Sequence, residues 1–242
     1  MVPNRLSCLS PMMLVALCAP GVALAEDQGQ PCTCVAQDVS SPSVELEADL
    51  TLFSDFRRGG ISLTNGGPAL QFNLEAAHAN GLHGGVFASN IRLDGTTRAE
   101  IDLSAGYARD VAGVEVDLGA IYYVIPGVSG TDYIELQASF GRSVGPVDVS
   151  LGFAWTPSQV ASGHQTNLYS GVDAEWAVTD SLSLYAAVGR ENGAFGDHKL
   201  DWSTGVTVDW AGFQWGAAYA DSHRAFAPHA APTLIFSLSK GL

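Results

Sequence analysis

Between Val44 and Leu242 the sequence alternates apolar and polar residues with a period of two, and this pattern constrains the fold more than any other feature. In the first such segment, residues 44–52, valine, leucine and alanine fill the even positions, whereas glutamate, aspartate and threonine fill the odd ones. A period of two is typical of β-strands, because their successive side chains point to opposite faces. The two faces of these strands must therefore meet different surroundings.

Twelve segments carry this alternation, and the links between them differ in length. The segments are residues 44–52, 69–78, 82–90, 100–107, 114–122, 134–140, 147–155, 168–178, 182–190, 200–210, 213–220 and 233–242. After every even segment the link is tight, as at Asn80-Gly81 and Ala211-Gly212. After every odd segment it is longer and polar: residues 57–67, 92–97, 126–131, 157–166, 191–198 and 221–232. Short turns at one end and long loops at the other are typical of outer-membrane barrels.

We therefore predict an all-β fold over residues 44–242, a transmembrane antiparallel up-and-down β-barrel of twelve strands with both ends in the periplasm. Closure is needed because an open sheet in lipid would leave backbone groups at its edges unpaired. Aromatic residues on the apolar parity fall near strand ends, where such rings meet the bilayer interfaces. They are Tyr107, Phe140, Trp176, Trp210, Phe213 and Trp215 at the periplasmic ends and Tyr122, Trp155 and Trp202 at the outer ends.

The N-terminal residues predict export. Arg5 precedes an apolar run and the small-residue site Ala23-Leu24-Ala25, so residues 1–25 are expected to be a cleaved signal peptide. Residues 26–43 are expected to form a polar periplasmic tail. Export, together with the expected barrel, predicts that the mature protein lies in the cell outer membrane. Within the tail, Cys32 and Cys34 could form a local disulfide or half a metal site, although no second cysteine pair completes one.

Charge limits the partners. The formal net charge is -14, and lysine occurs only at positions 199 and 240. Nucleic acid is therefore not expected as a partner, because phosphate binding depends on clustered Lys and Arg. The expected partners are outer-membrane lipids, the barrel-assembly machinery and small solutes or ions that the sequence does not identify.

Acidic residues occupy the polar parity systematically, and they are the candidates for a pore lining. They are Glu45, Glu47, Asp49, Glu75, Glu100, Asp102, Glu115, Asp117, Glu135, Asp148, Asp173, Glu175, Asp201 and Asp209. They either mark a hydrated interior or create a field that favours cations, as rings of Asp and Glu do. The expected strands contain no inward basic residue, but Arg57 and Arg58 near the outer mouth could fold inward and offset part of that field.

Catalytic and metal motifs are weak. Residues 141–145 fit G-x-S-x-G, but Pro146 and another strand follow instead of the helix that a nucleophile elbow requires. Asp221-Ser222-His223 has the residue types of a catalytic triad, yet neighbours in an extended segment point to opposite faces. Four histidines fall in outer loops without metal-ligand spacing: His164, His198, His223 and His229. We expect no enzyme, no cofactor and no metal.

Several motifs match a known family. They include Ser54-Asp55-Phe56-Arg57, Gly60-Ile61-Ser62, residues 81–90 and Phe236-Ser237-Leu238-Ser239-Lys240. With them the chain resembles the TorF-type porin family of proteobacteria, also described as the Gcw_chp domain family of unknown function. The resemblance implies an outer-membrane barrel without a settled substrate. The family expects a terminal Phe where this chain has Leu242, a change that bears on recognition by the assembly machinery.

The function that these patterns favour is a narrow monomeric porin that passes small hydrophilic solutes by passive diffusion. A barrel of about eight strands is filled by side chains, whereas about 16 to 18 strands leave an aqueous channel, so a twelve-stranded interior could be plugged. Two alternatives stay open. One is a non-conducting structural or receptor barrel that binds a partner through its outer loops, and the other is an outer-membrane hydrolase that uses His223.

Overall fold

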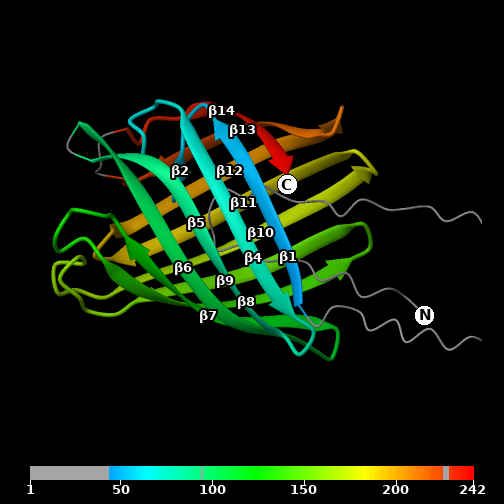
Figure 1. Ribbon diagram of the computed structural model, residues 1–242, viewed down its shortest axis with the longest axis horizontal. Coiled ribbons are helices and arrows are strands. Elements are labelled where there is room, and N and C mark those ends of the chain that lie inside the picture. The colour runs from blue at the N-terminus through cyan, green and yellow to red at the C-terminus, as the bar shows by residue number, and fades with distance from the viewer. Residues whose placement is uncertain (1–43, 94, 226–228) are drawn as a thin grey trace, which may run out of the picture.

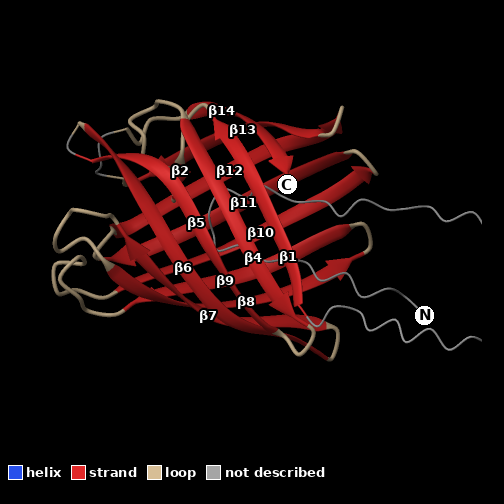
Figure 2. Ribbon diagram, in the orientation of Figure 1, coloured by secondary structure: helices blue, strands red, loops and turns tan. Residues whose placement is uncertain are grey.

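A computed structural model describes residues 44–93, 95–225 and 229–242 of the chain. The expected signal peptide and periplasmic tail, with Cys32 and Cys34, lie outside the described residues. Figure 2 shows that the described part of the chain consists of strands and connections, without helices. It accordingly contains no helix of the length and hydropathy needed to cross a bilayer.

Twelve strands form one closed antiparallel barrel (Figure 1). They are β1 (Val44–Phe53), β4 (Ala69–His78), β5 (Leu82–Leu93), β6 (Thr96–Val111), β7 (Val114–Val124), β8 (Tyr133–Val144), β9 (Val147–Thr156), β10 (Asn167–Thr179), β11 (Leu182–Gly193), β12 (Gly196–Trp210), β13 (Phe213–His223) and β14 (Thr233–Gly241). From β4 onward each strand pairs with the next, and β1 pairs with both β4 and β14. The predicted twelve-stranded barrel is confirmed.

The seam between the first and last strands is shorter than the neighbouring ladder. β1 pairs with β4 along its whole length, from Val44 opposite His78 to Phe53 opposite Ala69. Its pairing with β14 covers only the second half of β1, where Asp49 lies opposite Gly241. β1 therefore has fewer backbone pairs with β14 than with β4.

The connections that were expected to be tight all lie at one end of the barrel, together with the start of β1 and the end of β14; we call it the turn end (Figure 1, right). Residues 112–113, 145–146, 180–181 and 211–212 each join two strands there. At the last of these, Ala211 and Gly212 both have positive φ, 55° and 75°. Positive φ at both central residues is what a tight hairpin turn with right-handed strand twist requires.

The opposite end, which we call the loop end, holds the long connections, but two of the expected long loops are wrong. β5 and β6 continue until only residues 94–95 join them, and β11 and β12 until only residues 194–195 do. The expectation rested on alternation, which ends where both faces of a strand meet water. Backbone pairing continues past that point, because it does not depend on the side-chain pattern.

The two faces of the barrel wall differ as the alternation predicts. On β6, Leu103 is 47% exposed on the outer face, whereas Asp102 next to it is only 4% exposed on the inner face. Large apolar side chains are exposed on every barrel strand, and many buried side chains are polar or charged. An apolar exterior around a polar interior is typical of barrels that span a lipid bilayer.

A short hairpin in the connection between β1 and β4 enters this interior at the loop end. Its two strands are β2 (Arg57–Arg58) and β3 (Ile61–Ser62). Phe56, just before β2, is 3% exposed and belongs to a buried cluster with Phe53, Ile91 and Ile235 from the barrel wall. This apolar cluster anchors the base of the hairpin inside the barrel. The sequence predicted a loop here but not a hairpin.

Candidate functional site

The acidic residues predicted to line a pore all lie on strand positions that alternate with exposed apolar residues, so strand geometry points them inward. Asp49, Glu100, Asp102 and Asp201 are buried, while Glu75, Glu115, Asp117, Glu135, Asp173 and Glu175 are partly buried. Glu45, Glu47, Asp148 and Asp209 are exposed, because they lie close to strand ends at the turn end. The inner wall is acidic from one end to the other.

Asp55 organises the hairpin. Its Oδ2 atom accepts a hydrogen bond from Arg57 Nε at 2.7 Å, and its Oδ1 atom accepts one from Ser62 Oγ at 2.5 Å and one from Thr64 Oγ1 at 3.2 Å. All four side chains are buried, so the carboxylate replaces its lost hydration with three protein donors. Asp55 thereby joins β2, β3 and Thr64, which lies two residues after β3.

Arg57 ties the same hairpin to a second loop. Its Nη1 atom donates to the carbonyl oxygen of Gly60 at 2.9 Å and to that of Ala231 at 2.8 Å. Ala231 belongs to the connection that precedes β14, on the other side of β1. The hairpin follows β1 and leads into β4, and this hydrogen bond also attaches it to the connection before β14, which pairs with the other edge of β1.

Arg58 extends in the other direction, to β6 and β7. Its Nη2 atom lies 2.6 Å from Glu100 Oε1 and 3.5 Å from Asp102 Oδ2, and its guanidinium carbon lies 4.8 Å from the centre of the Tyr123 ring. Burial is the largest single effect and lowers the pKa of Arg58, but Glu100, Tyr123, Tyr133 and Asp102 together outweigh it and leave the pKa well above its usual value. Arg58 thus stays charged and offsets part of the acidic wall.

The tip of the hairpin meets the strands on the far side of the seam. Gly59, with φ of 55°, lies so close to Lys199 of β12 that a Cβ atom there would collide with the Lys199 Nζ atom. Gly60 approaches Ser222 of β13 in the same way. Lys199 is 2% exposed and forms an ion pair with Glu191 of β11. The hairpin therefore reaches from β12 to β7 and narrows the interior at the loop end.

Lys199 corrects one expectation, since no inward basic residue was predicted in the strands. The expected segment began at Leu200, directly after Lys199, whereas β12 begins four residues earlier, at Gly196. Lys199 has the same parity as Asp201, so extending the alternation by one residue would have placed it inside. The same extension of segment 114–122 would have placed Tyr123 inside.

Aromatic rings from the barrel wall also lie inside the barrel at the loop end, beside Arg58. Tyr123 of β7 stacks on Tyr133 of β8 with ring centres 4.4 Å apart, and Tyr133 meets Phe195 from the β11–β12 connection at 5.5 Å. Tyr169 of β10 donates a hydrogen bond to Asp201 Oδ1 at 2.9 Å. Together with Arg58, these side chains form a band across the loop end, which we call the mouth.

Two buried carboxylates at the mouth lack full compensation. Neither carboxylate oxygen of Asp102 has a hydrogen-bond partner, and Oδ2 of Asp201 has none either, among the residues that the structure describes. Glu135, in contrast, accepts hydrogen bonds from Tyr123, Gln137 and Thr156. Uncompensated buried carboxylate oxygens are costly unless a cation or a proton joins them.

Farther toward the turn end, a histidine joins the acidic wall. His83 Nε2 lies 3.0 Å from Asp117 Oδ1, and His83 Nδ1 lies 4.0 Å from Glu75 Oε1. His83 and Phe87 both point inward, as their place on the polar parity of β5 indicates. His83 thus lies between two carboxylates of the inner wall, separately from the residues at the mouth.

The catalytic motifs do not form sites in the structure. Residues 141–145 end β8 and enter the turn to β9, so no helix follows Ser143. Asp221, Ser222 and His223 lie at the end of β13, with Ser222 on the inner parity and the other two on the outer. Within the described part of the chain, no three His, Cys, Asp or Glu side chains are grouped so that they could hold a metal ion.

Comparison with solved structures shows a shared fold. The KdgM porin superimposes with a TM-score of 0.57 at 8% identity, over 81% of this chain and 97% of the porin. The NanC porin gives 0.53 at 7% identity, over 79% and 97%. The COG4313 outer membrane channel from Pseudomonas putida F1 gives 0.53 at 10% identity, over 87% and 100%. The chain therefore has the fold of outer-membrane porins and channels.

Sequence comparison assigns the family. Nothing among the curated proteins matches the chain. A family model described as a bacterial protein of unknown function (Gcw_chp) matches residues 36–233, which is most of the sequence. The chain belongs to the Gcw_chp family.

Proposed function

We propose that this protein is an outer-membrane channel through which small hydrophilic solutes diffuse passively, with cations favoured over anions. Its apolar exterior and polar interior support a place in the bilayer. Since short turns face the periplasm in such barrels, the turn end would face the periplasm and the loop end the outside. Assembly would require the barrel-assembly machinery, and we place the chain in the TorF-type group on the motifs at residues 54–62 and 81–90.

One observation supports the preference for cations most directly: the basic groups packed inside the mouth are already neutralised. Arg57 is paired with Asp55, Arg58 with Glu100 and Lys199 with Glu191. Asp102 and Asp201 nevertheless keep buried oxygens without hydrogen-bond partners among the described residues. A cation that passes the mouth can compensate these carboxylates, whereas an anion is repelled by them.

The size of the solute follows from the same contacts. The hairpin, the aromatic pair and Arg58 all occupy the mouth, so these groups narrow the passage at the loop end. We infer that ions and small polar molecules pass and that larger solutes do not. The size limit on the solute is set by the side chains that fill the mouth, and not by the number of strands in the barrel wall.

The test is the reversal potential of the purified protein in a planar bilayer under a KCl gradient. We expect a sign that indicates cation preference, and we expect Asp102→Asn combined with Asp201→Asn to weaken it. Glu45→Gln is the matched control, since it removes one carboxylate at the exposed turn end. Anion preference in the unmodified protein, or an unchanged potential in the double variant, would contradict the proposal.

The filled mouth also favours a second candidate, a non-conducting barrel that serves as a structural element or as a receptor for a partner at its loops. The two candidates differ in conductance. Current through the unmodified protein supports the channel. No current in that protein, together with current after the replacement of residues 57–62 by a short flexible linker, supports a barrel that the hairpin keeps closed.

A further inference from the structure

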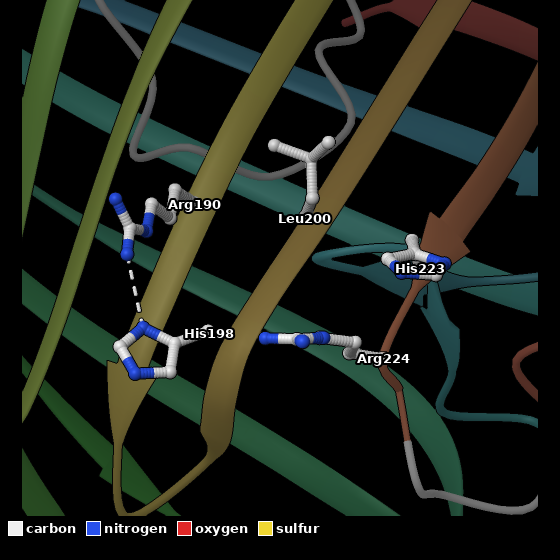
Figure 3. A pocket seen from close by; sticks show the side chains of 5 residues that line it. All are labelled: Arg190, His198, Leu200, His223 and Arg224. Carbon is white, nitrogen blue, oxygen red and sulfur yellow. Dashed lines mark hydrogen bonds between the residues drawn. The ribbon is translucent and has the colours of Figure 1, made fainter.

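A second group of basic side chains lies on the outer face of the barrel at the loop end. Arg190 of β11, His198 and Leu200 of β12, and His223 and Arg224 at the end of β13 line an open depression of about 590 Å³ (Figure 3). We call it the outer basic site. The channel proposed above does not use these residues.

Strand register places this site outside the barrel. Arg190 lies opposite Leu200, and Leu200 lies opposite His223, so the three residues form one row across β11, β12 and β13. Leu200 is 39% exposed, and Val188, two residues before Arg190 on the same face, is exposed as well. The row therefore faces the surroundings of the barrel and not its interior. Trp202 follows Leu200 on that face, one step closer to the middle of the wall.

The arginines of this site differ from those inside the barrel in having no carboxylate partner. Among the described residues, no Asp or Glu oxygen lies within 4.0 Å of Arg190 or Arg224. The acidic neighbours are Asp197, 3.7 Å from His198 Nε2, and Asp221, which hydrogen-bonds the Tyr219 hydroxyl and the Ser222 amide. In a chain with a formal net charge of -14, two arginines without carboxylate partners that line one depression leave a local positive charge.

One guanidinium is held in position before any ligand binds. Arg190 Nη2 lies 2.9 Å from His198 Nδ1. An arginine can only donate, so His198 accepts at Nδ1 and carries its proton at Nε2. His198 and Arg224 both have positive φ, 52° and 59°, which is uncommon outside glycine. Figure 3 shows the His198 ring beside the Arg190 guanidinium, and the Arg224 guanidinium pointing toward β12 from the other side.

We propose that the outer basic site binds a phosphate group carried by a glycolipid of the outer leaflet. Guanidinium groups match phosphate in charge and in geometry, because one guanidinium can donate two parallel hydrogen bonds to two phosphate oxygens. The site lies at the loop end of the face that meets lipid, and its exposed Leu200 can contact the apolar part of the same molecule. This inference rests on the membrane orientation proposed above and adds a ligand outside the channel.

The test measures binding of lipid A, a phosphorylated glycolipid, to the purified protein in a zwitterionic detergent. We expect saturable binding, and we expect the double variant Arg190→Ala and Arg224→Ala to weaken it by about tenfold or more, as the loss of charged hydrogen bonds predicts. Arg142→Ala is the matched control, because Arg142 is an exposed arginine near the turn end. We expect its affinity to equal that of the unmodified protein. Heat-dependent migration on a gel verifies that each variant is a folded barrel.

Two further probes identify the source of the phosphate. Lipid A without its phosphates should bind weakly, and inorganic phosphate should not compete at concentrations comparable to the lipid. Equal binding of the dephosphorylated lipid, equal affinity for inorganic phosphate, or full binding by the double variant would each overturn the proposal. Conductance of the double variant should match that of the unmodified protein. A failure of lipid binding is therefore distinguishable from a failure of the channel.

Discussion

Arg58 Nη2 lies 2.6 Å from Glu100 Oε1, so a side chain of the inward hairpin is tied to wall strand β6, two strands beyond β4. Arg58→Ala breaks this link and leaves Glu100 without its cation. We expect the change to destabilise the folded barrel by about 2 kcal/mol. We also expect a larger conductance and a stronger cation preference, because the mouth widens and loses a positive charge. Urea unfolding and bilayer recordings measure these effects, and Arg142→Ala should change neither.

The hairpin tip offers a test of the constriction that leaves all charges in place. Gly59→Ala adds a Cβ atom where Lys199 Nζ already lies, so either the end of the Lys199 side chain or the hairpin tip must shift. Gly145→Ala is the matched control, since Gly145 has a similar φ of 64° but open space around it. We expect the single-channel conductance to change in the first variant only. Equal effects would mean that backbone strain, and not the contact with Lys199, is responsible.

The two faces of β6 should differ in their tolerance of charge. Leu103→Arg places a cation on the exposed apolar face, and near the bilayer midplane this costs roughly 2 to 4 kcal/mol. Ser104→Arg places the same group on the inner face, where we expect a smaller penalty because water and carboxylates are available. Unfolding free energies of both variants in lipid vesicles make the comparison. Equal penalties would be inconsistent with an outer face that meets lipid.

The orientation of the barrel can be read from labelling on whole cells. With Cys32 and Cys34 replaced by serine, a cysteine introduced at Gln165 in the loop end should react with a membrane-impermeant reagent. A cysteine at Asn80 in the turn end should react only after the outer membrane is permeabilised. Both positions are exposed, so accessibility within the fold does not explain a difference. The reverse pattern would invert the proposed topology.

Export leaves a measurable trace in the mass of the protein. We expect the species extracted from membranes to begin at Glu26, because the small residues at positions 23 and 25 mark the cleavage site. Intact-mass measurement tests this directly. Retention of residues 1–25, or a lipid attached at Cys18, would contradict the expected maturation.

The sequence predicted the barrel wall well, because each strand has two faces in contrasting surroundings and therefore records its own orientation. Leu103 and Asp102, adjacent in sequence, lie on opposite faces as their polarity indicates. At the loop end the two faces of a strand no longer differ in their surroundings, so the alternation stops before the strand does. For this reason the extents of β5, β6, β11 and β12 at the loop end were underestimated.

The mouth was less predictable, because its contacts join segments that are far apart in the chain. The sequence placed Arg57 and Arg58 near an outer mouth, but not Arg58 against Glu100, which is 42 residues away. Nor did it indicate that Asp55 holds the hairpin or that Gly59 touches Lys199. Such contacts depend on how far strands are staggered around the barrel, and local alternation does not contain that information.

The short seam between β1 and β14 has a consequence for how the chain is made. β1 leaves the ribosome first, yet one side of its second half finds no backbone partner until β14 has been synthesised, when Asp49 meets Gly241 and Phe53 meets Ser237. Until then β1 and β13 both present an open edge, which is prone to pair with strands of other molecules. The newly made chain therefore needs protection of these two edges until β14 is in place, and the loss of its last nine residues would remove most of a wall strand together with the closure of the barrel.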